Sequence, residues 1–221
     1  MSWHCQSTYG WTDPSTTEWQ DNVTEITAFL RGYNWTDEAI AGVIGNMVHE
    51  SGINPWRWQG NNIQSSTSYS SATSVGYGLM QFTPSSKYID TASSYEGYGP
   101  NFSDIPGNIG EGHSQLLWFL NHTDQWGPAS WSEYPDVSMS EYSQMNLETI
   151  DTMVYIFMAN YERPLYEYAM SSLVQRQTYG RQVYEFITDH PIPGGRMPTW
   201  MLFKLAQNNN FWKKMGHTNF I

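Results

Sequence analysis

A single glutamate, Glu50, follows a stretch of the chain in which apolar residues recur at helical spacing. Cleavage of a glycosidic bond needs a proton for the leaving oxygen, and a carboxylic acid supplies it near neutral pH when an apolar or partly closed setting raises its pKa. The stripe before Glu50, with Trp56 and Trp58 after it, would provide such a setting by desolvation. A glutamate at a helix C-terminus also opposes the helix dipole, so this is a poor position for a charge without a role. Glu50 is therefore a candidate general acid, and the alternative is an ordinary exposed glutamate at a helix end.

A second segment that could take part in chemistry, GYGLMQFTP, occupies residues 76–84. Its glycines, Gly76 and Gly78, permit a tight turn and positive φ angles. Three of its apolar side chains would form the floor of a cleft: Leu79, Met80 and Phe82. A hairpin turn packed on the core is compatible with this role. Ser51, next to the acid, is a candidate to hydrogen-bond the acid or a sugar, and Trp58 is a further candidate to bind substrate.

Four motifs follow one another along the chain, and they are most specific as a set. They are WTDEAIAGVIGNMVHES at 35–51, ESGINP at 50–55, GYGLMQ at 76–81 and NYERP at 160–164. The set resembles goose-type lysozymes and lytic transglycosylases, and it resembles the phage tail lysozyme family more closely. His49 is the departure, because many relatives carry another residue before the glutamate.

The resemblance covers about residues 18–190 and implies a fold and an activity. The fold would be α+β and mainly helical, lysozyme-like, with a small β or loop lobe next to the catalytic helix. The activity would be a peptidoglycan glycosidase (muramidase type) that cuts the MurNAc–GlcNAc backbone without a cofactor. By the same resemblance, Gln81 would contact the sugar near the acid, and Tyr161 would hydrogen-bond within the active site.

The sequence offers no second carboxylate close to Glu50, because no aspartate or glutamate occurs between Glu50 and Asp90. Glycosidases normally use two carboxyl groups. The absence agrees with the single-glutamate scheme of goose-type enzymes and transglycosylases, in which water or a sugar hydroxyl attacks the anomeric carbon. Glu162 is either a direct participant or a structural partner of Arg163 or Arg31. The distant candidates for a second role are Glu162, Asp90, Glu96 and Asp104.

Helical spacing of apolar residues predicts five helices, at about 18–33, 36–51, 109–121, 146–161 and 165–188. Asn34 or Thr36 would cap the second helix, and Gly52 would end it. The Ser-, Thr- and Asn-rich residues 60–75 predict an exposed loop or short hairpin, and residues 84–107 and 123–143 are predicted to be irregular.

These elements divide the chain into three parts. An N-terminal arm takes residues 1–17, and the lysozyme-like catalytic domain takes residues 18–190. Residues 191–221 would be a linker followed by a tail whose aromatic residues either dock on a partner or fold back onto the core.

Composition excludes some partners and leaves others open. The 221 residues carry a net charge of −11, whereas nucleic-acid binders carry a basic footprint. The chain contains no apolar run of about 18 residues, so no membrane span is predicted. Residues 1–22 lack the pattern of a secretory signal. The expected partners are peptidoglycan glycan strands and phage tail proteins. The expected location is the virion tail, or the host cytoplasm before release.

Two classes of function stay open at this point. The first is a cell-wall enzyme: a tail-borne lysozyme, an endolysin for host lysis, or a lytic transglycosylase. The second is a lysozyme-like module kept as a non-catalytic part of the virion, with the arm and the tail as docking surfaces. The presence of Glu50 favours the enzyme, because a module without turnover has no need of an acid.

Neither a metal ion nor a disulfide is expected, because no HExxH or CxxC motif is present and Cys5 is the only cysteine. We predict that the rate of cell-wall clearing, followed by the turbidity of a cell-wall suspension, is the same with and without EDTA or a thiol reductant. A loss of activity in EDTA that zinc or calcium restores would contradict this prediction.

Overall fold

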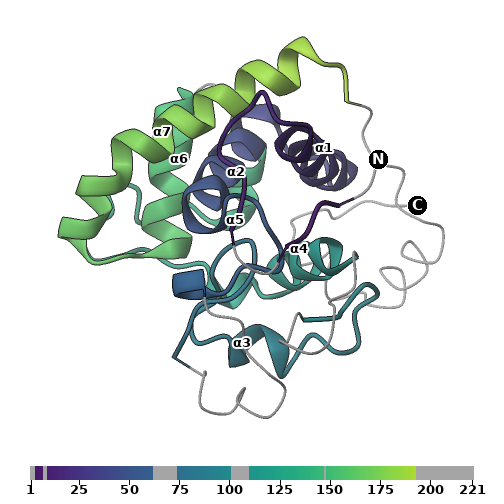
Figure 1. Ribbon diagram of the computed structural model, residues 1–221. Helices are drawn as coiled ribbons and strands as arrows, with labels where there is room; N and C mark the ends of the chain where they lie inside the picture. The colour runs from purple at the N-terminus through teal and green to yellow at the C-terminus, as the bar shows by residue number, and fades with distance from the viewer. Residues whose placement is uncertain (1–2, 7–8, 62–73, 101–109, 147, 193–221) are drawn as a thin grey trace, which may run out of the picture.

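The computed structural model describes residues 3–6, 9–61, 74–100, 110–146 and 148–192, and helices dominate this part of the chain (Figure 1). The longer helices are α1 (Thr17–Gly32), α2 (Asp37–Ser51), α4 (Glu111–Asn121), α6 (Ile150–Phe157) and α7 (Tyr166–Asp189). The shorter ones are α3 (Ser86–Ile89) and α5 (Met139–Gln144), with 3₁₀ turns at Gln59–Asn61 and Thr123–Gln125. α6 continues into a π-helical turn, Met158–Glu162. None of the helices described is both long and apolar enough to cross a bilayer.

The central element is α2, which packs most extensively against α7 and α6 (Figure 1). Thr36 caps its N-terminus by accepting a hydrogen bond from the backbone amide of Ala39, and Gly52 ends it in the left-handed conformation with φ 60°. Every residue from Ala39 to Val48 is buried. The predicted bounds of this helix are therefore confirmed. The helix passes through the core, and its last turn extends beyond the middle of the core.

A pair of glycines lets α2 and α7 come into backbone contact. A Cβ atom added to Gly45 would lie 2.7 Å from the backbone nitrogen of Gly180 and 3.0 Å from the carbonyl oxygen of Arg176. Side chains cannot be accommodated at such distances from a backbone, so glycine is required at this crossing. The crossing brings the middle of α7 against the C-terminal half of α2.

The predicted β lobe is wrong, because the described residues contain no strand or sheet. The segment after α2 makes only isolated bridges, which pair Trp58 with Tyr77 and Tyr77 with Phe82. Positive φ angles at Gly78 and Gln81 interrupt extended backbone there. Residues 62–73, which hold most of the predicted loop or hairpin, lie outside the described residues. The fold is therefore mainly α-helical rather than α+β.

Aromatic packing holds this segment in place of a sheet. The ring of Trp58 lies 4.4 Å from that of Tyr77, and the ring of Phe82 lies 4.8 Å from that of Trp118 on α4, measured between centroids. Ring pairs at these separations stabilise a fold beyond the burial of their area. The segment thus packs against α4 through side chains, in addition to the few backbone hydrogen bonds of its isolated bridges.

The segments predicted to be irregular contain two short helices, α3 and α5. At the start of α5 the side chain of Ser138 accepts a hydrogen bond from the amide of Glu141, and the Glu141 carboxylate accepts one from the amide of Ser138. This reciprocal cap stabilises a helix of six residues, which is too short to show a helical period in the sequence.

The N-terminal arm packs onto the domain. The side chain of Asn22 on α1 accepts a hydrogen bond from the amide of His4 at 2.8 Å and donates one to its carbonyl oxygen at 2.9 Å. The amide of Trp11 donates to the carbonyl oxygen of Gly52 at 2.8 Å. The arm therefore stabilises the C-terminal end of α2. Of the predicted linker and tail, residues 193–221 lie outside the described residues.

We predict that Gly45→Ala lowers the free energy of unfolding by roughly 1–3 kcal/mol, the usual cost of overpacking a core. The added methyl group meets the backbone of α7, which cannot move aside without separating the helices. Gly127→Ala is the matched control, because its Cβ would meet only the tip of Arg163, at 3.8 Å. Urea titration followed by circular dichroism measures both. Equal midpoints for the two variants would contradict the role of the crossing.

Candidate active site

A cleft of about 490 Å³ opens where the end of α2, the 76–84 segment and the start of α7 meet. This volume is in the range of ordinary ligand sites. The cleft is lined by charged, polar and aromatic side chains: His49, Glu50, Arg57, Gln59, Met80, Gln81, Phe82, Thr83, Lys87, Trp118, Gln125, Tyr161, Glu162, Arg163, Pro164 and Tyr168, together with Gly60.

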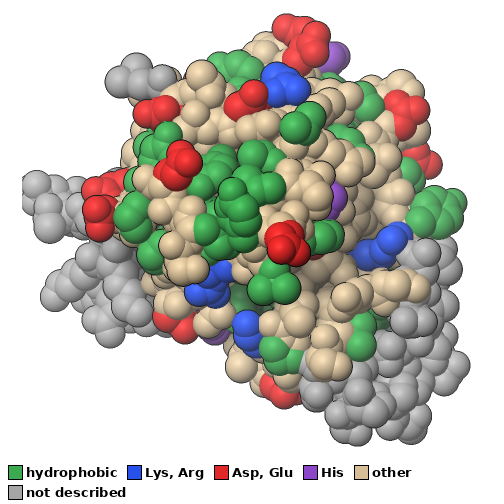
Figure 2. All heavy atoms as spheres, turned by 90° about the vertical axis from the view of Figure 1, so that its left-hand side faces the viewer, with side chains coloured by type: hydrophobic (Ala, Val, Ile, Leu, Met, Phe, Trp, Pro, Cys, Tyr) green, Lys and Arg blue, Asp and Glu red, His purple; other side chains and the backbone are tan. Residues whose placement is uncertain are grey.

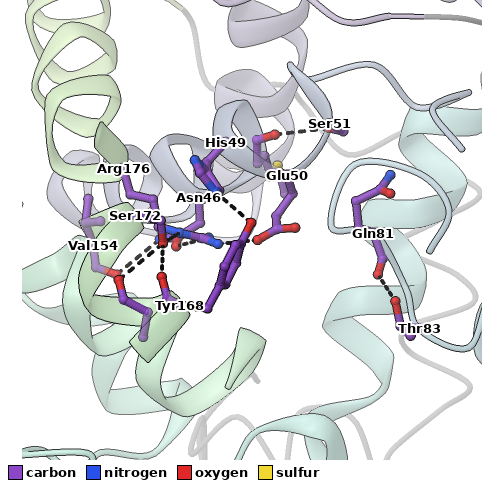
Figure 3. Close-up of polar contacts among 12 residues, drawn as sticks. Asn46, His49, Glu50, Ser51, Gln81, Thr83, Val154, Tyr168, Ser172 and Arg176 are labelled. Atoms are coloured by element: carbon purple, nitrogen blue, oxygen red, sulfur yellow. Dashed lines mark hydrogen bonds and ion pairs between the residues drawn. The ribbon is translucent and has the colours of Figure 1, made fainter. Parts of the chain in front are cut away.

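Glu50 lies in this cleft on the last turn of α2, with its side chain 19% exposed. Its carboxylate forms an ion pair with Arg176 from α7, whose side chain is fully buried (Figure 3). The setting of Glu50 thus differs from the apolar pocket expected from sequence, since a buried cation holds one oxygen of the acid. The partial exposure leaves the carboxyl group accessible from the cleft.

A polar network fixes the guanidinium of Arg176. Its Nη1 donates to Oδ1 of Asn46 on α2 at 2.9 Å, and its Nε donates to Oγ of Ser172 at 3.2 Å. The Asn46 amide in turn donates to the carbonyl oxygens of Gly42 and Val154, at 2.8 and 3.1 Å. The network ties α2, α6 and α7 together around one charge. Removing one partner of such a buried pair typically costs about 3–5 kcal/mol.

The turn at residues 78–81, here called the GLMQ turn, is hydrogen-bonded to α4 and α2. Gln115 of α4 accepts a hydrogen bond from the amide of Leu79 at 2.7 Å and donates one to the carbonyl oxygen of Pro55 at 2.7 Å. The hydroxyl of Ser51 donates to the carbonyl oxygen of Leu79 at 2.9 Å. Gly78 has φ 81°, and a Cβ atom there would lie 2.4 Å from the Gln115 side chain. The turn therefore has a fixed position relative to Glu50.

A buried carboxyl group, Glu111, hydrogen-bonds to the residues that hold this turn. It accepts hydrogen bonds from the hydroxyl of Tyr77, the amide of Gln115 and the backbone of Gly99. Burial raises the pKa of Glu111 to about 7, although hydrogen bonds from these groups and from Tyr88 act in the opposite direction. Because the folded state holds this proton more tightly than the unfolded chain, the contribution of Glu111 to stability falls as pH rises from about 4.5 to 7.

His49 precedes the acid and lines the same cleft. Its Nε2 lies 3.3 Å from the hydroxyl of Tyr168 on the first turn of α7 (Figure 3). Burial, and secondarily the charge of Arg176, lower the pKa of His49 to about 4. The imidazole is therefore neutral at physiological pH, so it adds no positive charge beside Glu50.

Glu162 brings a second carboxyl group to the cleft, from the π-helical turn that follows α6. Its Oε1 atom is buried and accepts no hydrogen bond. Burial raises the pKa of Glu162 well above its usual value, and the negative charge of Glu50 raises it further. Arg176 and Arg163 act in the opposite direction. Arg31, the other partner considered for Glu162, pairs instead with Asp37.

The structure separates the predicted site residues into two groups. Those that line the cleft are Glu50, Met80, Gln81, Phe82, Tyr161 and Glu162. Those that are buried behind its surface are Ser51, Gly78, Leu79 and Trp58. Asp90 and Glu96 do not line this cleft, and Asp104 lies outside the described residues. Figure 3 shows Gln81 across the open space from Glu50.

Sequence reasoning missed Arg176, Asn46 and Ser172. A signal for Arg176 was present, because it falls on the buried face of α7 together with Ala169, Ser172, Gly180, Val183 and Ile187. A lone arginine in such a stripe indicates a buried cation that needs a partner. Nothing in the sequence identifies that partner, which lies 126 positions away.

Two observations bear on metals and thiols. No cluster of three or more histidine, cysteine, aspartate or glutamate residues suited to a metal occurs among the residues described. Burial raises the pKa of Cys5 to about 12, so its thiol stays protonated and unreactive at neutral pH.

Comparison with known proteins agrees with the motifs. The family model described as phage tail lysozyme matches residues 21–187, a range that includes Glu50, the GLMQ turn, Glu162 and Arg176. Morphogenesis protein 1 of Bacillus phage B103 is 29% identical over 178 residues, which cover 76% of this chain and 43% of that protein. The chain thus spans less than half the length of this relative. Because the family model covers most of the sequence, the chain belongs to the phage tail lysozyme family.

Proposed function

We propose that this protein is a peptidoglycan glycosidase that cuts the MurNAc–GlcNAc backbone, with Glu50 as its catalytic acid. The observation that carries the proposal is the placement of Glu50: a partly exposed carboxyl group, held by a buried arginine, that lines a cleft of about 490 Å³. Membership of a lysozyme family supports the reaction class.

The cleft contains the groups that this reaction needs. A proton from Glu50 would go to the leaving glycosidic oxygen while water, or a hydroxyl group of the sugar, attacks the anomeric carbon. Gln81 and Thr83 stand on the opposite wall (Figure 3). Their side-chain hydrogens are donated to backbone carbonyl oxygens, so Oε1 of Gln81 and Oγ1 of Thr83 would serve as acceptors for sugar hydroxyls. The turn that carries them is held by Ser51 and Gln115, so the two walls keep a fixed separation.

Apolar surface suited to sugar rings accompanies these polar groups. Met80, Phe82 and Trp118 line the cleft, and Tyr168, 54% exposed, stands at its edge. Figure 2 shows hydrophobic side chains gathered in the middle of the face that forms the left-hand side of Figure 1. Met80, Phe82 and Trp118 are almost fully buried, so the exposed ring of Tyr168 is what this lining offers to the apolar face of a sugar.

The family name and the relative point to where the enzyme would work. We propose that the protein travels with the virus particle and opens the wall during penetration, as the names phage tail lysozyme and morphogenesis protein suggest. Mass spectrometry of purified particles tests this location. Detection of the chain in particles supports it, whereas a chain present only in the soluble lysate indicates an endolysin.

We predict that Glu50→Gln keeps the fold and lowers wall clearing by roughly two to four orders of magnitude, the scale of general acid catalysis. The amide oxygen of the glutamine can still accept a hydrogen bond from Arg176, so the network stays in place. Glu38→Gln, at the other end of α2, is the matched control, because an amide oxygen there can still accept from Tyr184. Clearing within a few-fold of the parent for the Glu50 variant would rule out the assignment.

The products distinguish the remaining chemistries. Mass spectrometry of the muropeptides released by the parent protein should show cleavage between MurNAc and GlcNAc. Reducing ends on the products indicate attack by water, and anhydro-sugar ends indicate attack by a hydroxyl group of the sugar itself. If no muropeptides are released by the folded protein, the proposal fails and the lysozyme-like module is non-catalytic.

A further inference from the structure

Two carboxyl groups line the cleft, and a buried cation lies behind its surface against one of them. Glu50 comes from α2, Glu162 from the π-helical turn after α6, and Arg176 from α7. The guanidinium donates to Glu50, Asn46 and Ser172, and none of these hydrogen bonds goes to Glu162. One positive charge is therefore committed to one of two neighbouring carboxyl groups.

The surroundings of Glu162 oppose a second negative charge. Its Oε1 atom is buried and accepts no hydrogen bond, and a buried carboxylate oxygen without a partner disfavours a negative charge. The charged and titratable groups around it, on its own segment and across the cleft, are Glu50, His49, Arg176, Tyr161, Arg163, Arg57, Lys87 and Tyr168. Burial and the negative charge of Glu50 both raise the pKa of Glu162. Their combined effect exceeds the lowering by Arg176 and Arg163, so the protonated form is favoured.

We propose that Glu50 and Glu162 work as a pair that retains a single proton, and that Arg176 stabilises the one negative charge that remains. The role of the pair in catalysis rests on the proposed glycosidase function, whereas the shared proton itself does not. Glu162 acts through Glu50 in this scheme and is a proton-holding partner rather than a second nucleophile.

The reaction balances with one proton in the pair. The pair passes its proton through Glu50 to the glycosidic oxygen as the C–O bond breaks, and the leaving sugar gains a hydroxyl group. Both carboxyl groups are then ionised until a proton returns, and the carboxylate of Glu50 stabilises the positive charge that develops at the anomeric carbon. Water, or a sugar hydroxyl, forms the new C–O bond, and the proton that it loses returns to the pair.

The first test needs no substrate. The folded state holds the proton of Glu162 more tightly than the unfolded chain does, so this residue destabilises the fold increasingly as pH rises above about 4.5. Glu162→Gln removes that contribution. The melting temperature of the variant, minus that of the parent, should therefore increase between pH 4.5 and pH 8. Glu167→Gln, on the exposed first turn of α7, should show no such trend. A constant difference for Glu162→Gln would overturn the shared proton.

The second test is the pH profile of wall cleavage. Without Glu162, no second carboxyl group remains in the cleft to hold the proton of the pair. The alkaline limb of the profile should move down by at least about one pH unit in Glu162→Gln, the scale of one neighbouring charge. Glu162→Asp should move it back towards the parent, and Glu167→Gln should leave it in place. Reduced activity at all pH values with an unmoved limb would show that Glu162 is only structural.

The two tests fail separately. If the parent protein releases no muropeptides, the proposed glycosidase function fails, and the melting comparison alone decides whether the proton is shared. If the parent is active and the melting difference stays constant with pH, the glycosidase stands and the proton pair is refuted.

Discussion

The buried guanidinium of Arg176 is the constraint on which the rest of the site depends. A full positive charge without exposure to solvent must be matched by oxygen atoms from nearby elements, and here they come from Glu50, Asn46 and Ser172. Asn46 stands one turn before Glu50 on α2, so the two groups face α7 from the same side of their helix. The close crossing at Gly45 and Gly180 brings Arg176 within reach of both. Helix packing and placement of the acid are therefore one arrangement.

The opposite wall of the cleft depends on a different set of contacts, which are neutral and made largely to backbone. Gln115 and Ser51 hold Leu79 by its amide and its carbonyl oxygen, and the arm secures the end of α2 through Gly52. The residues that do this lie behind the cleft rather than in it. A loop without regular strands thus keeps a defined distance from Glu50, because the backbone amide and the carbonyl oxygen of Leu79 are both hydrogen-bonded.

The sequence predicted the parts of the fold that depend on local period and on capping. The bounds of α2 were predictable because Thr36, a buried apolar stripe and Gly52 all act within one segment. The β lobe was wrong because glycines and polar residues near a turn do not distinguish a hairpin from an aromatic loop that packs through Trp58 and Tyr77. The motifs contain Glu50, Gln81 and Glu162, which line one cleft, whereas Ser51, predicted to bond the acid or a sugar, and Leu79, predicted to form the cleft floor, are buried behind it. Arg176 could not be paired with Glu50 from sequence, because that contact depends on how two distant helices cross.

The π-helical turn at Met158–Glu162 has a consequence for how this site can vary. A π-helix holds one residue more per hydrogen-bonded turn than an α-helix, so it is equivalent to a one-residue insertion within a helix. Side chains that follow such an insertion are rotated by roughly 100° relative to the course of an uninterrupted α-helix. Loss of one residue from the start of this turn, such as Ala159, is therefore expected to restore α-helical pairing and to turn Tyr161 and Glu162 away from the cleft, while the composition of the segment would hardly change. In this part of the chain, deletions are therefore expected to be more damaging than most substitutions, and the length of the NYERP segment is as much a determinant of the site as its residues.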